Sequence, residues 1–191
     1  MKAVSWWNRY VDFWREREAP DAYALARMVW GTVVLANLVH QMISPGVLEL
    51  YALPEDGGVW TLHKRPSYSL FQFVDQTASV VWGIVISGLV AALALIVGLG
   101  TRVAAVVLMV VNMTLVGRLS LFGFGGDTVY SVFSFLVVLC PMGASWSLDA
   151  WLFGAGRAQV SKWPRRLVIA QVTFLYVKTG LVKAGSQWSF S

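Results

Sequence analysis

The residues that could do chemistry in this chain are few, and they lie within or at the ends of long apolar runs. Three of them would support proton transfer: Lys183, Asp127 and His40. A buried lysine can lose its proton and act as a base, and a nearby carboxylate favours its charged form. The membrane topology predicted from the basic residues places all three on the outer side of the membrane, so if the chain is an enzyme we expect Lys183 and Asp127 to share one catalytic site there.

Lys183 and Asp127 each have a simpler interpretation as well. Lys183 would anchor the outer end of a helix at the membrane interface. Asp127 follows two glycines and precedes a threonine, which suits a helix N-cap. A helix turns by about 500° between Lys178 and Lys183, so these two lysines cannot face the same site.

Arg27 lies inside the first apolar run, where a charge costs about 2.5–3.5 kcal/mol on insertion scales. Three interpretations stay open for Arg27. Its long side chain extends so that the guanidinium reaches the inner membrane interface, or the guanidinium contacts a carboxylate or backbone carbonyls inside the bundle. The third is that it binds a ligand directly. We predict four structural polar residues within the apolar part of the chain: Arg27, Lys178, His40 and Asp149.

No metal site is predicted. Neither His40 nor His63 has a second histidine or a carboxylate three or four residues away, and Cys140 is the single cysteine. Structural and catalytic zinc sites need three or four such ligands.

The elements that must position these residues follow from the composition. Hydrophobic residues make up 57% of the 191 residues and charged residues 13%, about half of the roughly 25% in a soluble domain. The net charge of +5 comes from basic residues scattered between apolar runs, which fits membrane orientation better than nucleic-acid binding. We therefore predict an all-α integral membrane protein, with the lipid bilayer as partner and no nucleic acid.

Five apolar runs predict a bundle of about five transmembrane helices in a single domain over residues 1–191. Each must be helical, because unpaired backbone groups are prohibitive in hydrocarbon. Residues 76–101 contain no charged side chain and exceed the roughly 20 residues that spanning requires. The predicted spans lie near residues 21–43, 76–100, 103–122, 128–148 and 166–183.

Three finer features follow from the same runs. Gly98-Leu99-Gly100, followed by Thr101 and Arg102, predicts a helix end with a tight turn rather than a phosphate-binding loop. Gly83, Ser87 and Ala91 repeat at every fourth position, which predicts a face on which another helix packs closely. Residues 1–20 hold tryptophans and charges but no apolar signal-peptide region, so we expect no cleavable signal peptide and a first span that is retained.

Residues 44–75 form the one long loop, and its prolines, paired glycines and aromatics predict an ordered interfacial loop. Tryptophan and tyrosine gather at the ends of membrane spans. The predicted interface anchors are Trp60, Trp146, Trp163 and Trp188.

The distribution of basic residues predicts an orientation. With five spans and the N-terminus inside, the inner segments hold Lys2, Arg9, Arg15, Arg17, Arg102, Arg157, Lys162, Arg165 and Arg166. The outer segments hold only Lys64, Arg65, Arg118 and Lys183. The excess of inner positive charge predicts a cytoplasmic N-terminus and an outside C-terminus, in what we expect to be a bacterial cytoplasmic membrane.

Three stretches resemble the horizontally transferred transmembrane (HTTM) family, which is related to the membrane part of the vitamin K-dependent gamma-carboxylase. The first is Arg27 followed by Gly31 in ARMVWG. The second runs from the Gly126-Asp127 step through PMGASWSLD at residues 141–149. The third is YVKTGLVKAGSQW, with Tyr176, Gly180, Lys183 and Trp188.

The resemblance implies that Lys183 occupies the position of the lysine that, in the carboxylases, is the proposed base for deprotonating vitamin K hydroquinone. The chain departs from that pattern in several places. Val182 stands where the carboxylases have a second lysine, Asp127 stands where they have a histidine, and their large lumenal substrate domain is missing. The sequence stops soon after Trp188, so we expect either a shortened member or part of a longer chain.

Three functions stay open. The favoured one is a non-catalytic accessory or scaffold subunit of a larger membrane complex, such as a respiratory or photosynthetic assembly, with other membrane subunits as partners and no required cofactor. The second is a carboxylase-like enzyme that depends on vitamin K or another quinone, with Lys183 as base. The third is a bundle that binds or transports a lipid or small molecule, for which Asn37 and Asn112 are isolated polar residues near mid-span.

Overall fold

The computed structural model describes residues 2–44, 46, 51–56, 69–118, 125–154 and 159–183. Over these residues the chain has seven α-helices, two short 3-10 helices and one ladder of two very short strands. The predicted all-α class is therefore confirmed for the described part of the chain. The chain divides into two compact units, Met1–Glu18 with Gln159–Ser191 (unit 1) and Ala19–Ala158 (unit 2).

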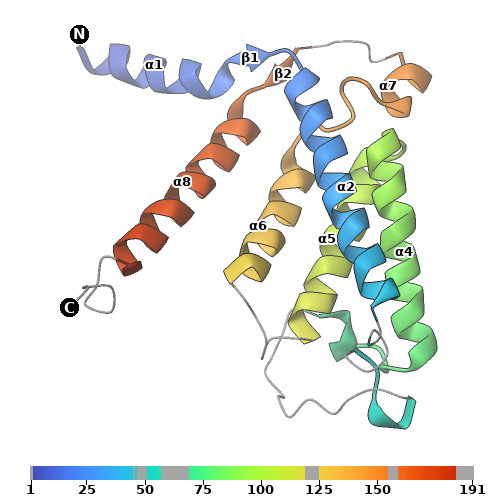
Figure 1. Ribbon diagram of the computed structural model, residues 1–191. Coiled ribbons are helices and arrows are strands. Elements are labelled where there is room, and N and C mark those ends of the chain that lie inside the picture. Colours follow the sequence, from blue (N-terminus) through green and yellow to red (C-terminus); the bar gives the residue numbers. More distant parts are fainter. Residues whose placement is uncertain are drawn as a thin grey trace. The chain divides into compact units, whose positions relative to one another are not determined.

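Unit 2 contains a helix bundle whose members pack in chain order (Figure 1). Helix α2 packs on α4, α4 on α5, and α5 on α6. The Trp30 ring of α2 also lies 4.9 Å from Tyr130 and 6.0 Å from Phe133, both on α6, measured between ring centroids. The elements are α2 (Asp21–Ile43), the 3-10 helices η1 (Pro54–Asp56) and η2 (Leu70–Gln72), α4 (Ala78–Val97), α5 (Thr101–Arg118), α6 (Gly125–Leu139) and the short α7 (Leu148–Leu152).

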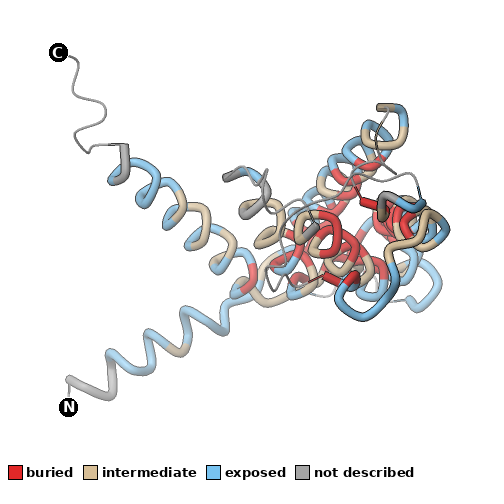
Figure 2. The backbone as a smooth tube through the Cα atoms, turned by 90° about the horizontal axis from the view of Figure 1, so that it is seen from below, coloured by how far each residue is buried: buried red, intermediate tan, exposed pale blue. Residues whose placement is uncertain are grey.

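Helix α4 buries one stripe of side chains and exposes another, as Figure 2 shows for the bundle. The buried stripe, spaced by three and four residues, is Val81, Val85, Gly88, Ala91, Ala92 and Leu95. Of the predicted small-residue face, Ala91 is buried, but the expectation of close packing at Gly83 is wrong, because a Cβ built there meets nothing within 4 Å. Close approach occurs instead at Gly31, where a Cβ would lie 2.7 Å from Ile96, and at Gly88, where it would lie 3.0 Å from Leu38.

Two of the described helices, α2 and α4, are long and apolar enough to cross a membrane. Helices α5 and α6 contain shorter apolar stretches, Thr101–Gly117 and Val129–Leu139. Helix α6 ends at Leu139 rather than near residue 148. Pro141 explains the early end, because proline disfavours helical geometry in the residue before it and has no N–H to donate.

The predicted interfacial loop 44–75 lies mostly outside the described residues. Its described parts are attached to the bundle by hydrogen bonds. The backbone N–H of Leu53 donates to the carbonyl of Gln76 over 3.1 Å, and the Ser69 hydroxyl donates to the carbonyl of Thr114 on α5 over 3.1 Å.

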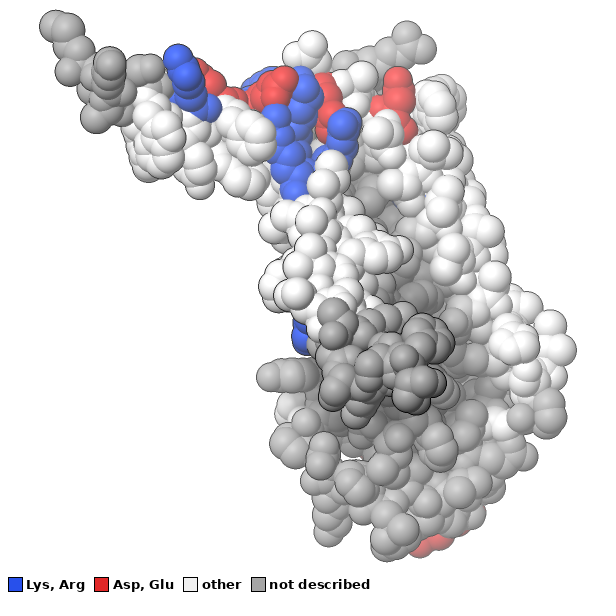
Figure 3. Space-filling view, turned by 60° about the vertical axis from the view of Figure 1, so that its left-hand side comes forward, with Lys and Arg blue, Asp and Glu red and all other residues white. Residues whose placement is uncertain are grey.

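Unit 1 contains α1 (Lys2–Arg15), β1 (Arg17–Glu18), β2 (Val160–Ser161) and α8 (Trp163–Lys183). The two strands pair antiparallel, so the end of α1 is joined to the start of α8. Basic and acidic side chains gather at this junction (Figure 3). The apolar runs predict a span near 166–183 but no helix before residue 21, so the structure adds α1 to the predicted elements.

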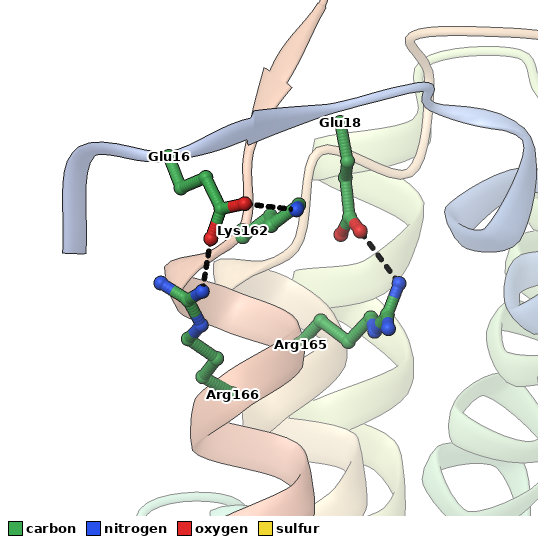
Figure 4. Close-up of polar contacts among 5 residues, drawn as sticks. All are labelled: Glu16, Glu18, Lys162, Arg165 and Arg166. Atoms are coloured by element: carbon green, nitrogen blue, oxygen red, sulfur yellow. Dashed lines mark hydrogen bonds and ion pairs between the residues drawn. The ribbon is translucent and has the colours of Figure 1, made fainter. Parts of the chain in front are cut away.

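A cluster of ion pairs holds the junction of unit 1 together (Figure 4). Glu16 accepts hydrogen bonds from Lys162, over 2.6 Å, and from Arg166, while Arg165 donates to Glu18 over 2.5 Å. Hydrogen bonding to Lys162 and Arg166 holds the pKa of the Glu16 carboxyl below its ordinary value.

Candidate functional site

Arg27 is the one fully buried charged side chain among the described residues, with 0% of its surface exposed. Its Nη2 donates to the carbonyl of Trp146 over 2.5 Å, and its Nη1 donates to the carbonyl of Met142 over 3.4 Å. Both acceptors lie in the turn that follows α6. The geometry is therefore that of a cation bound by backbone carbonyls inside the bundle.

The turn at residues 140–147 is shaped to present these carbonyls. Pro141 prevents α6 from continuing into the turn. Trp146 adopts a positive φ of 48°, which is uncommon for a residue other than glycine. Ser147 accepts a hydrogen bond from the N–H of Ala150, over 3.0 Å, and so caps α7. Its hydroxyl also donates to the carbonyl of Gly143 over 2.6 Å, which closes the turn.

Asp149 joins the same region to the α4–α5 turn. One carboxylate oxygen accepts from the N–H of Gly100 over 2.8 Å, and the other accepts from the N–H and hydroxyl of Thr101 over 2.9 and 3.0 Å. The carboxylate thus meets the positive end of the α5 dipole. Burial alone would raise the pKa of Asp149, but these hydrogen bonds and the charge of Arg27 lower it overall.

Gly98 lets the two turns approach each other. It follows the last residue of α4 in a left-handed conformation with φ of 84°, which confirms the helix end and tight turn predicted there. A Cβ at this position would contact the Arg27 guanidinium and would lie 2.7 Å from the Cα of Ser147. Arg27, Gly98, the 140–147 turn and Asp149 therefore form one connected structure, which we call the Arg27 network.

The Arg27 network is suited to holding the bundle together rather than to catalysis. A guanidinium stays protonated and donates hydrogen bonds, so it cannot act as a base. The Asp149 carboxylate is occupied by three hydrogen bonds from Gly100 and Thr101. Within the described residues, Arg27 Nε is a buried donor without a hydrogen-bond partner.

A second polar feature is a pocket of about 280 Å³ between α2, α5 and α6. Asn37, Gln41 and Asn112 line it, together with the rings of Tyr51 and Tyr130. Gln41 donates to Asn37 over 2.6 Å, and Tyr51 donates to Gln41 over 3.3 Å. Carboxamides and phenols in this arrangement bind neutral, hydrogen-bonding groups.

Asn112 and Tyr130 are the deeper polar members of this pocket. Asn112 is only 3% exposed, and its amide donates to the Ser134 hydroxyl over 2.8 Å. The Tyr130 hydroxyl is buried and has no hydrogen-bond partner among the described residues. Asn37 and Asn112, which look isolated in the sequence, thus lie on the same pocket.

Comparison with known proteins gives the family. A family model described as the HTTM domain matches residues 16–191, which is most of the chain. The chain belongs to the HTTM family. No curated protein and no solved structure matches it.

The HTTM assignment confirms the resemblance expected from the sequence, and with α2 and α4 it supports a membrane protein. The structure does not test the predicted catalytic pair, since the side chains of Lys183 and Asp127 lie outside the described residues and their helices belong to different units. Their catalytic roles therefore stay predictions. The N-cap interpretation of Asp127 is wrong, because α6 begins at Gly125 and Asp127 lies in its first turn.

The other predicted residues of this HTTM protein have varied surroundings. His40 is exposed on α2, and Lys178 is exposed on α8. The Trp146 ring is 60% exposed, and Trp163, the first residue of α8, is 38% exposed. The remaining predicted anchors, Trp60 and Trp188, lie outside the described residues.

Sequence reasoning missed Gln41, Tyr51 and Tyr130 as pocket residues. Gln41 had a usable signal, because it follows Asn37 by one helical turn and shares its face. Nothing in the local sequence marks Tyr51 or Tyr130, since aromatic side chains are common in apolar runs. Their place in the pocket depends on how α2, α5 and α6 pack.

Replacing Gly98 with alanine is predicted to destabilise the protein by roughly 2–4 kcal/mol, because it adds backbone strain and a clash with Ser147. Gly83→Ala is the matched control on the same helix, since its Cβ meets nothing. The control should be neutral or stabilising by up to about 1 kcal/mol. Unfolding in detergent, followed by circular dichroism, compares the two variants; equal midpoints would contradict the close packing at Gly98.

Asp149→Asn is predicted to cost about 1–3 kcal/mol at neutral pH, through loss of charged hydrogen bonds to Gly100 and Thr101. The folded-state pKa of Asp149 is below its ordinary value of 3.8. Its contribution is therefore complete above that value and is lost as the pH falls through the folded pKa. The unfolding midpoint of the unsubstituted protein should drop in this acid range more than that of the variant. Asp75→Asn, an exposed acid, is the control; an identical acid response in all three proteins would contradict this role.

Proposed function

We propose that this HTTM protein is a multi-pass membrane protein that acts as a non-catalytic accessory or scaffold subunit of a larger membrane complex. The observation that carries the proposal is Lys178, an exposed cation and the one charged residue of α8 between Arg166 and Lys183. A lysine within a membrane span is costly unless an acceptor faces it. A neighbouring subunit would supply that acceptor.

The exposed surface of the helices supports the membrane part of this proposal. Helix α2 exposes Leu25, Val29 and Val33, and α4 exposes Ile86, Val90 and Leu93. Helix α8 exposes Leu167, Ile169, Phe174, Val177 and Leu181. Extensive apolar surfaces of this kind are covered by lipid or by other proteins, and the small loops leave most of the mass in helices.

The proposed topology has five spans, α2, α4, α5, α6 and α8, with the N-terminus inside. Helix α5 has 18 residues and α6 has 15, so they are about 27 and 22 Å long. These lengths approach the roughly 30 Å hydrocarbon core. The excess of basic residues in the predicted inner segments supports the orientation.

Native membranes extracted in mild detergent test the complex directly. Native mass spectrometry should show the chain with other membrane subunits at fixed stoichiometry. Lys178→Met should reduce that co-purification by at least about tenfold, which corresponds to 1.4 kcal/mol. Arg102→Met, at an exposed arginine near the start of α5, should leave it unchanged. A wild-type chain that remains a monomer under these conditions would contradict the proposal.

The pocket between α2, α5 and α6 favours a second function, the binding of a neutral lipid-soluble molecule with an oxygen-bearing head group. A quinone has this chemistry, and the carboxamides of Asn37, Gln41 and Asn112 are suited to its carbonyl oxygens. The lining residues in the pocket are uncharged, which suits a neutral head group. This function requires no catalytic residue and is compatible with a subunit role.

Titration of the purified protein with a short-chain ubiquinone analogue tests the pocket. Asn37→Leu and Gln41→Leu should each weaken binding by up to about tenfold, since a neutral hydrogen bond contributes about 0.5–1.5 kcal/mol. Thr32→Val is the control on the same helix, because its hydroxyl bonds only the Met28 carbonyl and is exposed. Equal affinities in all three variants would rule out this pocket as the binding site.

A further inference from the structure

Helix α1 is amphipathic, and its apolar face is almost entirely aromatic. Positions spaced by one, three and four residues place these side chains together on one side of a helix. Their exposed fractions range from 37% at Trp14 to 68% at Trp6. The members of this aromatic face are Trp6, Trp7, Tyr10, Phe13 and Trp14.

The rings of the aromatic face touch one another and form a continuous surface. Tyr10 stacks with Trp6 and Trp7 at centroid distances of 6.0 and 5.8 Å. Trp14 meets Tyr10 and Phe13 edge to face at 6.2 and 5.4 Å. Exposing such an apolar surface to water is energetically unfavourable, so we expect lipid or another protein to cover it.

The opposite face of α1 is polar. Asn8, Arg9, Asp12 and Arg15 lie on it and are exposed. Arg9 and Arg15, together with Arg17 of β1, form no ion pair with any described residue of unit 1. The helix therefore combines a bulky aromatic side with a surplus of unpaired positive charge.

The junction of unit 1 fixes α1 to the first turn of α8. The Arg166 guanidinium lies 3.5 Å from the centroid of the Phe13 ring and also pairs with Glu16. The antiparallel pairing of Arg17 with Ser161 joins the same two segments. In the proposed topology α8 enters the bilayer near Trp163, so the C-terminal end of α1 lies at the membrane boundary.

We propose that α1 lies in the plane of the membrane interface, with its aromatic face among the head groups and upper acyl chains of the leaflet where α8 begins. Tryptophan and tyrosine prefer this region, and an amphipathic helix binds there through its apolar face. Arg9, Arg15 and Arg17 bind anionic lipid head groups at the same leaflet. The helix precedes the matched HTTM residues 16–191.

Depth measurements on the full-length chain in vesicles test this placement. The buried Cys140 is first replaced by alanine, and single cysteines carrying the environment-sensitive label NBD are then introduced. Trp7→Cys and Tyr10→Cys report on the aromatic face, and Asn8→Cys and Asp12→Cys are matched controls on the polar face. Quenching by lipids that carry a doxyl group near the head group should be at least about twofold stronger for the aromatic-face labels.

The lipid composition tests the charged part of the proposal. Quenching of the Trp7→Cys label should increase when phosphatidylglycerol is added to phosphatidylcholine vesicles. Arg9→Gln combined with Arg15→Gln should remove most of that increase, because the lipid charge then has fewer partners. An unchanged increase in the double variant would overturn the role of these arginines.

Two results would overturn the interfacial placement itself. Equal quenching on both faces would show that α1 is not oriented by lipid. Aromatic-face labels shielded from both lipid quenchers and water-soluble quenchers would show that a protein partner covers the face instead. A label at Val90→Cys on α4 distinguishes failure of the α1 placement from failure of the proposed membrane topology. Lipids that carry a doxyl group deep in the acyl chain should quench the Val90→Cys label even when α1 does not bind the membrane interface.

Discussion

Burying the Arg27 guanidinium inside an apolar bundle is the constraint on which the rest of unit 2 depends. A buried cation without acceptors would be very unfavourable, and helix backbones cannot supply acceptors because their carbonyls are already used. The carbonyls must therefore come from a segment that is not helical. The 140–147 turn is that segment. It must lie beside α2, because the carbonyls of Met142 and Trp146 accept the hydrogen bonds of Arg27.

Other features then follow from the same contact. The α4–α5 turn must approach the 140–147 turn closely, which requires glycine at position 98. The Asp149 carboxylate completes the arrangement, because it caps α5 and places a negative charge in the electrostatic field of Arg27. Four helices are thus tied together at one end by backbone groups and two ionised side chains. The polar pocket lies among α2, α5 and α6 and is lined by uncharged residues.

The sequence predicted much of the helical framework, because long apolar runs are a strong signal. It also predicted the end of α4 at Gly98 and the HTTM family, and both are confirmed. It did not predict α1, whose charges interrupt its aromatic residues in the linear sequence while the helix separates them onto two faces. The predicted small-residue face is buried at Ala91 but open at Gly83, because Gly88, not Gly83, is the glycine of α4 that packs against Leu38 and Val111.

In the candidate site, too, some residues could be predicted from the sequence and their partners could not. Arg27 and Asp149 could be selected as structural residues from their types and surroundings, but their partners are mostly backbone atoms of distant residues. Backbone carbonyls carry no sequence signature, so Met142 and Trp146 could not be identified in advance. The place of Asn37 and Asn112 on one pocket likewise depends on how α2, α4, α5 and α6 pack together, which local sequence does not encode.

The contact that joins the bundle also links distant parts of the chain. The carbonyls of Met142 and Trp146 lie 115 and 119 residues after Arg27, so neither acceptor exists until most of unit 2 has been synthesised. A chain truncated before residue 142 would contain the buried cation and three of the helices around it, but neither carbonyl that binds it.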